Sequence, residues 1–156
     1  MRAFLRTMAV AILLSAGIGA SAVTAEPLWN KEKGFFGGEW DYALNGYDPV
    51  SYFFEAPVKG DPQFNTDYLG VTWIFATQEN RDRFIADPDA NRPQYGGHCA
   101  YALARSDSLV FGDPEVWTLV DGKIYLNFDK SVQQRWSEDI PGNIAKSDLN
   151  WADKIK

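Results

Sequence analysis

The stretch WTLVDGKIYLNF, residues 117–128, carries the strongest fold signal in this chain. Two short runs rich in β-branched and aromatic residues flank Asp121-Gly122. An Asp-Gly pair between two such runs is typical of a two-residue turn between antiparallel strands. We therefore expect strands at 117–120 and 123–128, joined as a β-hairpin.

A helix is predicted to follow this hairpin. Asp129 stands directly after the second strand and has a side chain that can cap the first turn of a helix. The helix is expected to continue through about Ser137 and to end near Pro141. Residues 117–137 thus form a hairpin-plus-helix unit.

A similar unit stands 52 residues earlier in the sequence. Strands are predicted at Phe64–Tyr68 and Val71–Phe75 around Leu69-Gly70. Thr77 then caps a helix that runs to about Ala86 and stops at Asp87-Pro88. The aligned pairs are Gly70 with Gly122, Trp73 with Tyr125, Thr77 with Asp129, Arg83 with Arg135, Phe84 with Trp136, and Asp87 with Asp139.

Two hairpin-plus-helix units predict an α+β fold, with one small antiparallel sheet of about four strands and helices packed on it. The apolar pattern of the two hairpins differs. At the offset of 52 residues, Trp73 and Phe75 align with Tyr125 and Asn127. The alternating apolar residues of the second hairpin, however, start one position earlier, at Ile124. Either the strand registers differ by one residue, or both faces of the second hairpin are covered.

The N-terminus has the pattern of a secretory leader. Arg2 and Arg6 precede an apolar run at 8–18, and small residues up to Ala25 form a cleavage site. The apolar run is too short to span a bilayer comfortably, so no stable membrane insertion is expected. We predict a signal peptide at 1–25 and a periplasmic or secreted protein.

After the leader the chain is predicted to hold one domain. Residues 26–46 are expected to form an extended lead-in, and 47–152 the domain, which is large enough to bury a core without disulfides. Asp48-Pro49 is typical of a helix start, so a short helical turn is expected at 50–54. Residues 58–65 are expected to be a loop.

The charge balance excludes some partners. The chain has 15 basic and 21 acidic residues, a formal net charge of −6. Removing the leader removes two arginines and no acid, so the remainder is more acidic still. An acidic surface argues against nucleic acid and anionic lipid as partners.

The stretch QYGGHCAY, residues 94–101, holds the one histidine and the one cysteine of the chain. Gly96 and Gly97 are predicted to form a turn into a helix at 100–105. Cys99 would then lie near the first helical turn, where unpaired backbone N–H groups stabilise a thiolate or a bound anion.

One hypothesis for this stretch is a metal site of the copper or zinc class, with His98 and Cys99 as ligands and Asp48 completing the sphere. Adjacent residues make a poor chelate, because their side chains diverge by about 100° on a helix. Two chains that share one metal, or a disulfide between two Cys99 thiols, would imply a homodimer.

A second hypothesis is a small-ligand site. Backbone N–H groups from Gly96 to Cys99 would hold a carboxylate or similar anion. Tyr47, Tyr95 and Tyr101 would form the walls of the pocket. Its alternative is that the two glycines only make a tight turn for close packing.

Two further classes stay open. A hydrolase that uses Cys99 needs a histidine from elsewhere in the fold, and the chain has only the neighbouring His98, so we assign no catalytic residue. Dithiol redox chemistry lacks a second cysteine. The other class is a protein-interaction or scaffold domain in which Cys99 is buried and inert.

Several elements of the chain resemble the exported, single-domain members of the YHS domain family. The matching segments are GYDPV (46–50), YLGVTWIF (68–75), FIADP (84–88), PQYGGHCAY (93–101) and WTLVDGKIYLN (117–127). The resemblance covers about residues 44–151. It implies the fold of that family and, for this chain, an exported binding module.

The resemblance also bears on metal binding. Short YHS domains are associated with metal handling, for example in some copper-transporting ATPases and some hydroxylases. The presumed metal thiols of the family match Ser51, Ala76 and Asn80, and none of these is a thiol. We therefore expect a binding module for a metal ion or small ligand at residues 96–99 instead.

Overall fold

A computed structural model describes residues 41–156 of the chain. The predicted leader and residues 26–40 of the predicted lead-in lie outside this part. The elements are η1 (Ala43–Gly46), η2 (Pro49–Phe53), β1 (Asp61–Tyr68), β2 (Val71–Phe75), α1 (Gln78–Ala86), α2 (Pro88–Asn91), η3 (Gln94–Gly97), α3 (Ala100–Ser106), β3 (Asp113–Val120), β4 (Lys123–Asn127), α4 (Lys130–Ser137) and α5 (Ile140–Lys154), where η marks a 3-10 helix.

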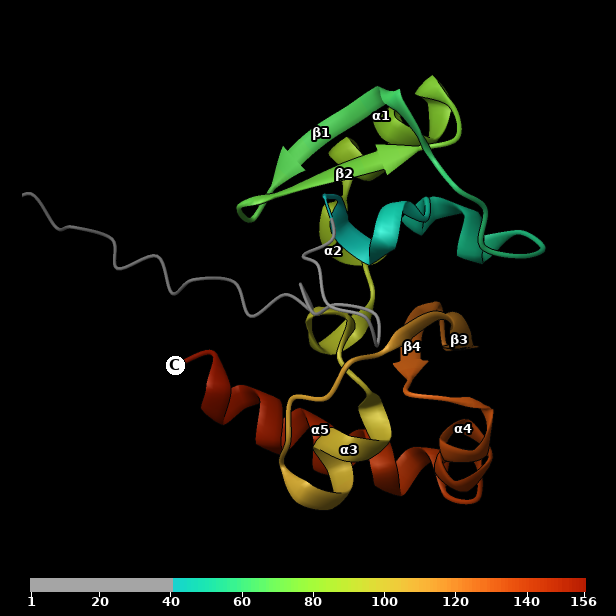
Figure 1. Ribbon diagram of the computed structural model, residues 1–156. Coiled ribbons are helices and arrows are strands. Elements are labelled where there is room, and N and C mark those ends of the chain that lie inside the picture. The colour runs from blue at the N-terminus through green and yellow to red at the C-terminus, as the bar shows by residue number, and fades with distance from the viewer. Residues whose placement is uncertain (1–40) are drawn as a thin grey trace, which may run out of the picture.

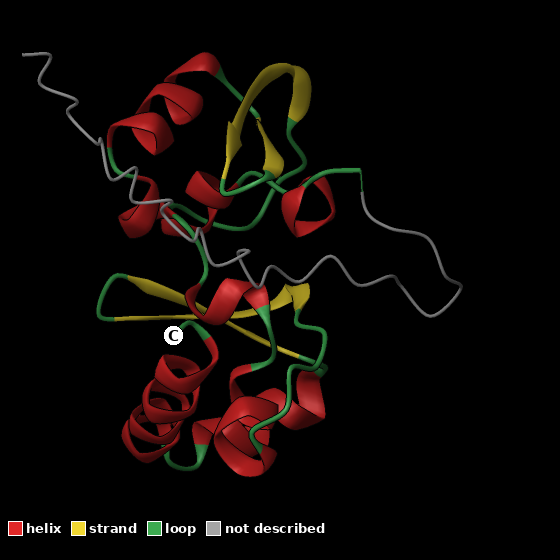
Figure 2. Ribbon diagram, turned by 90° about the vertical axis from the view of Figure 1, so that its left-hand side faces the viewer, coloured by secondary structure: helices red, strands yellow, loops and turns green. Residues whose placement is uncertain are grey.

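The predicted α+β class is confirmed, and the strands form two separate hairpins. β1 pairs with β2 and β3 with β4, each as a two-stranded antiparallel sheet, in place of the single four-stranded sheet that we expected. Figures 1 and 2 show the hairpins in different halves of the molecule. We call residues 41–91 the first lobe and residues 92–156 the second lobe. Across residues 41–156, no helix combines the length and apolar character needed to cross a membrane.

Both hairpin turns have the predicted two-residue form. Leu69 and Gly70 have φ angles of 52° and 74°, and Asp121 and Gly122 have φ angles of 49° and 72°. Positive φ at both central residues is the feature of a type I′ turn, whose twist matches that of the flanking strands. The turn residues therefore fix where each hairpin reverses.

Both faces of β4 are covered, which explains the phase difference between the hairpins. Ile124 and Leu126 are fully buried in the core of the first lobe, where they join Trp73. Tyr125, which points the opposite way, is buried against Trp136 in the core of the second lobe. β4 therefore lies between the two cores.

The helix caps predicted after each hairpin are confirmed. The Thr77 hydroxyl accepts a hydrogen bond from Asn80 N at 3.1 Å and begins α1. The Asp129 carboxylate accepts one from Val132 N at 2.7 Å and begins α4. Each cap satisfies a backbone donor that the first helical turn leaves unpaired.

Two predicted boundaries are wrong. Pro141 does not end a helix but lies in the first turn of α5, where its missing N–H costs nothing, and Asp139 caps this 15-residue helix. The predicted loop at 58–65 is a strand from Asp61 onward, although an irregularity between Asp61 and Asn65 interrupts its pairing.

The repeat begins earlier than the hairpins. Leu44 and Asn45 in η1 have φ angles of 53° and 51°, and Tyr95 and Gly96 in η3 have φ angles of 55° and 60°. The hydrogen bonds that follow correspond as well. Tyr47 N donates to Leu44 O as His98 N donates to Tyr95 O, both at 3.0 Å. Asp48 N then donates to Val58 O as Cys99 N donates to Val110 O, both at 2.8 Å. Asp48 and Cys99 thus occupy equivalent positions in the two lobes.

Candidate functional site

Cys99 lies at the N-cap position of α3, as predicted, and its side chain is fully buried. Its Sγ lies 3.7 Å from Asn127 Oδ1, the distance of a weak S–H hydrogen bond. Burial raises the pKa of the Cys99 thiol, although nearby backbone N–H groups, that of Ala102 foremost, act in the opposite direction. The thiol is therefore neutral at pH 7.

Asp48, the equivalent residue in the first lobe, is also fully buried. Its Oδ1 accepts from Val50 N at 2.8 Å. Its Oδ2 accepts from Ala76 N at 2.9 Å and from Asn80 Nδ2 at 2.6 Å. Three donors thus satisfy the carboxylate, which holds β2, η2 and α1 together.

The three positions that the family resemblance links to metal gather around Asp48. Ala76 and Asn80 donate to its carboxylate, and the Ser51 hydroxyl donates to its backbone oxygen at 2.6 Å. The Ser51 hydroxyl, the Ala76 N–H and the Asn80 amide are therefore all engaged in hydrogen bonds with Asp48.

In the described residues, the three predicted metal ligands are not gathered at one place. Among residues 41–156, no group of three or more histidine, cysteine or acidic side chains is arranged to hold a metal ion. His98 is buried, with its ring 6.4 Å from that of Trp151. Cys99 and Asp48 lie in separate lobes, each within its own hydrogen bonds.

Two of the backbone N–H groups of the predicted anion site are hydrogen-bonded within the chain. Both glycines are buried, with φ angles of 60° and 79°. His98 N and Cys99 N, which we expected to face a ligand, donate to Tyr95 O and Val110 O. Gly97 also packs closely, because a Cβ on Gly112 would lie 2.4 Å from Gly97 O. The tight-turn alternative accounts for these contacts.

The three predicted tyrosines have different polar or cationic partners. The Tyr47 hydroxyl donates to Glu115 at 2.7 Å, and burial, with help from Glu115, raises the pKa of Tyr47 to about 12. Tyr101 lies under the guanidinium of Arg135 at 5.9 Å. The Tyr95 hydroxyl donates to Asp148 Oδ1 at 2.8 Å. Tyr95 borders the pocket described next.

A pocket of about 550 Å³ opens between the lobes, and we call it the interlobe pocket. It lies between α2, the segment that leads into η3, the β3–β4 turn and the C-terminal half of α5. Its lining residues are Asp89, Ala90, Arg92, Pro93, Gln94, Tyr95, Asp121, Gly122, Lys123, Asp148, Trp151, Ala152 and Ile155. This volume lies within the usual range for sites of small molecules.

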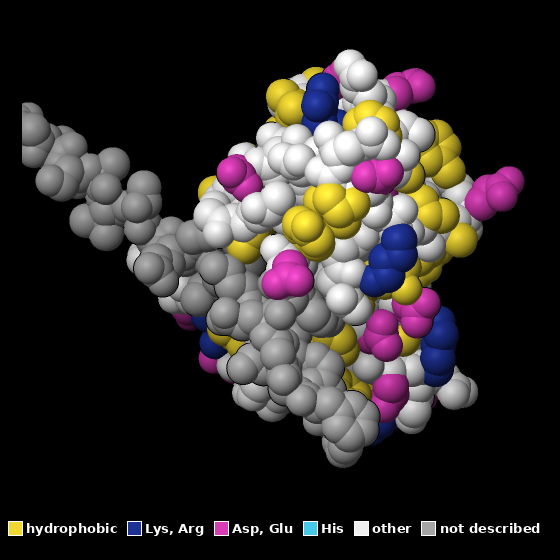
Figure 3. All heavy atoms as spheres, turned by 45° about the horizontal axis from the view of Figure 1, so that its top comes forward, with side chains coloured by type: hydrophobic (Ala, Val, Ile, Leu, Met, Phe, Trp, Pro, Cys, Tyr) yellow, Lys and Arg dark blue, Asp and Glu magenta, His cyan; other side chains and the backbone are white. Residues whose placement is uncertain are grey.

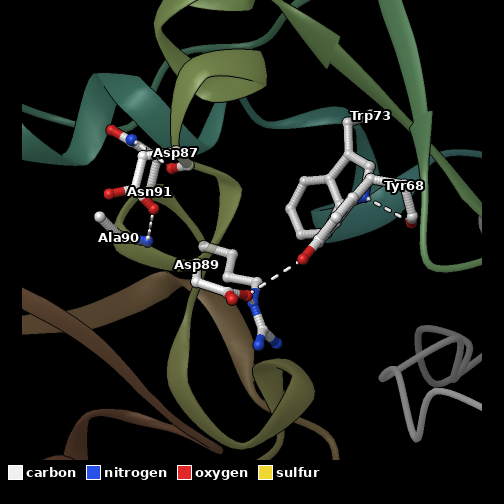
Figure 4. Close-up of polar contacts among 7 residues, drawn as sticks. Tyr68, Trp73, Asp87, Asp89, Ala90 and Asn91 are labelled. Carbon is white, nitrogen blue, oxygen red and sulfur yellow. Dashed lines mark hydrogen bonds and ion pairs between the residues drawn. The ribbon is translucent and has the colours of Figure 1, made fainter.

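Hydrogen bonds fix the first-lobe wall of the interlobe pocket. The Tyr68 hydroxyl donates to Asp89 Oδ1 at 3.1 Å, and Arg92 Nε donates to the same oxygen at 2.7 Å (Figure 4). The pairing with Arg92 lowers the pKa of Asp89. Asp89 and Arg92 therefore largely neutralise one another.

Sequence reasoning found Tyr95 and missed the rest of the interlobe pocket. Its walls come from segments far apart in the chain, and each looks ordinary by itself: a helix end, a hairpin turn and the exposed face of a helix. One wall of the pocket also depends on α5, a helix that we did not predict from the sequence. The fold alone brings these segments together.

A second, shallower hollow of about 690 Å³ lies beside η2. Phe53, Phe54 and Val58 line it, with the side chain of Phe54 67% exposed and that of Val58 45% exposed. Figure 3 shows hydrophobic side chains at the surface on the side of the first lobe, interspersed with charged ones. Isolated exposed apolar residues are normal, whereas contiguous apolar patches often mark contact surfaces.

Comparison with protein-family models, curated proteins and solved structures finds no match to this chain. The resemblance to the YHS domain family therefore stays a prediction.

Proposed function

We propose that this chain is a binding module that holds a small organic molecule in the interlobe pocket. The observation that carries the proposal is a cavity of about 550 Å³ in which Tyr95 and Trp151 stand beside charged side chains from both lobes. Apolar and aromatic walls with a few fixed polar groups are typical of small-molecule sites.

The surroundings of Cys99 favour this proposal over metal binding or thiol catalysis. A nucleophile or a metal ligand needs a thiolate that its partner can reach. Cys99 is fully buried, its pKa is raised, and neither of the two pockets described above is lined by it. The ligand site is therefore proposed a few residues before the cysteine, at Gln94 and Tyr95.

We also propose that the module works outside the cytoplasm. The N-terminal pattern of arginines, an apolar run and small residues supports export. Cell fractionation, with N-terminal sequencing of the recovered protein, tests this proposal. A protein that keeps residues 1–25 and stays in the cytoplasm would contradict it.

A substitution that fills the interlobe pocket tests the binding function. Ala152 lines the pocket on α5, whereas Ala145 is exposed on the same helix and does not line it. Thermal-shift measurements with a panel of amines, amino acids, carboxylates and monosaccharides should identify at least one compound that raises the Tm.

The shift caused by that compound should disappear in Ala152→Trp and persist in Ala145→Trp. If the shift is the same in both variants, the ligand binds elsewhere and the proposed site is wrong.

Self-association is a second candidate function, favoured by the hollow beside η2. Burying Phe54 and Val58 against a second copy of the chain would remove exposed apolar area from water. Light scattering after size-exclusion chromatography should then show a dimer that Phe54→Asp converts to a monomer. A wild-type monomer at all concentrations rules this candidate out.

A further inference from the structure

We infer that the interlobe pocket takes an organic cation, with its ammonium group at the Asp148 carboxylate and against the Trp151 ring. This inference rests on the proposed function and names the class of its ligand.

The Asp148 carboxylate is exposed and has no basic partner. It accepts one hydrogen bond, from the Tyr95 hydroxyl, and no lysine or arginine in residues 41–156 lies within ion-pair distance of it. The negative charge of Asp148 acts on two neighbouring tyrosines. Burial is the main cause of the raised pKa values of Tyr95 and Tyr125, and Asp148 is the second cause. The Tyr95 hydroxyl also fixes the position of the carboxylate.

The aromatic surface lies next to this charge. Trp151 follows Asp148 by three residues on α5, and side chains three apart in a helix share a face. The Trp151 and Tyr95 rings lie 6.1 Å apart at a steep angle, and both line the pocket. Tryptophan is the aromatic residue that attracts cations most strongly. A carboxylate beside two aromatic rings is a suitable site for an ammonium group.

The remaining charges of the pocket leave a negative balance. Arg92 is paired with Asp89. Of the other charged lining residues, Asp121 and Asp148 are acidic and Lys123 is basic. The net charge of the whole chain, −6, has the same sign and would attract a cation from solution. An anion in the pocket would be repelled by Asp148, and Lys123 at the hairpin turn is the lining base that has no ion pair within residues 41–156.

Choline and its uncharged isostere, 3,3-dimethyl-1-butanol, test the inference because they have the same shape and differ in charge. Isothermal titration of the full chain should show choline binding at least about tenfold more tightly than the isostere. Asp148→Asn keeps the shape of the side chain and should weaken choline binding about tenfold. The isostere should bind Asp148→Asn and the wild type equally.

Control variants separate the failure of this inference from the failure of the proposed function. Asp153→Asn removes a charge from the exposed surface of the same helix outside the pocket, and it should leave choline binding unchanged. Trp151→Leu should weaken choline binding about fivefold.

Equal choline binding by Asp148→Asn and the wild type, or no choline binding up to about 10 mM, overturns the cation inference. The proposed function survives that result if another compound of the panel shifts the Tm in an Ala152-dependent way. It fails separately if no compound does.

Discussion

The equivalent residues Asp48 and Cys99 show how one backbone arrangement accommodates two chemistries. In the first lobe the position holds a carboxylate bound by three N–H donors. In the second lobe it holds a thiol, which backbone N–H groups also surround. A buried carboxylate needs all its donors, whereas a thiol behaves as a small apolar group with a weak S–H donor. The cysteine is thus explained by packing.

We predict that Cys99 reacts slowly in the folded protein. Because its side chain is fully buried and its pKa is raised, reaction requires local or global opening of the structure. Modification by 5,5′-dithiobis(2-nitrobenzoic acid) at pH 8 should be at least about 100-fold slower than in 6 M guanidinium. Equal rates in the two solutions would show an accessible thiol and would reopen the catalytic and metal hypotheses.

We predict that Gly112→Ala destabilises the protein by roughly 2 kcal/mol, because the added Cβ would lie 2.4 Å from Gly97 O and 2.9 Å from Leu126 Cβ. Urea denaturation followed by tryptophan fluorescence measures this loss. Gly122→Ala is the control: its Cβ meets nothing within 4 Å, and its φ of +72° costs only about 1 kcal/mol. If Gly112→Ala lowers the free energy of unfolding by less than Gly122→Ala does, Gly112 is not closely packed against Gly97 and Leu126.

At the scale of elements, the two hairpin-plus-helix units obey local rules that the sequence displays. Asp121-Gly122 sets the second turn, and Thr77 and Asp129 cap the helices that follow each hairpin. These features depend on neighbouring residues only, so they were predictable. Pro141 was misread because proline at the first turn of a helix and proline after a helix look alike in a sequence.

Other features depend on contacts between distant segments and were not predictable. The pattern of β4 left open whether its registers shift or both faces are covered, and only the packing of two cores decides this. The turns before Asp48 and Cys99 share a backbone shape with little sequence similarity. The interlobe pocket needs α2, β4 and α5 together, so the candidate site was found at one residue, Tyr95.

We predict that Asp129→Ala and Thr77→Ala each lower the free energy of unfolding by about 1 kcal/mol, because each removes the acceptor for one backbone N–H of a helix. Urea denaturation of the single variants and of the double variant measures this. The two losses should add within about 0.5 kcal/mol, since the caps share no partner. The substitutions Asp129→Asn and Thr77→Ser, which retain a capping oxygen, should restore most of the stability.

At the scale of the whole molecule, β4 makes the two lobes one folding unit. Its side chains alternate between the core of the first lobe and that of the second. Separating the lobes would expose Ile124 and Leu126, which are now fully buried. The burial of these two side chains therefore holds the lobes together in addition to the covalent connection between them.

We predict that Ile124→Ala destabilises both lobes together, by about 3 kcal/mol. Ile124 belongs to the second hairpin by sequence and to the core of the first lobe by contact. Urea titration should be followed by one NMR reporter in each lobe, the indole N–H groups of Trp73 and Trp136. Both signals should lose intensity at the same urea concentration, in the variant as in the wild type. Separate midpoints would show that the lobes unfold independently.

We predict that stability falls at alkaline pH. Burial raises the pKa of Cys99 above its ordinary value of 9.0 and the pKa values of Tyr52, Tyr95 and Tyr125 above 10.0, while that of Tyr47 rises to about 12. The unfolded chain releases these protons first. The stabilisation is therefore complete below about pH 9 and is lost as the pH rises toward 12.

Guanidinium denaturation at pH 7, 9 and 10.5 checks this dependence. The free energy of unfolding should be similar at pH 7 and 9 and lower at pH 10.5. Absorbance at 295 nm should rise with unfolding at pH 10.5, as tyrosines ionise. A free energy that increases between pH 9 and pH 10.5 would reverse the sign of the argument.

The sharing of β4 between two cores also constrains the ancestry of the chain. The buried residues of the second core all come from the second lobe, whereas the first core includes Ile124 and Leu126 of β4. If the two lobes arose by duplication of one gene segment, the first copy therefore came to rely on a strand of the second, and the second copy did not come to rely on the first. Such a one-sided dependence would leave the two halves of the polypeptide unequal in how well each could persist without the other.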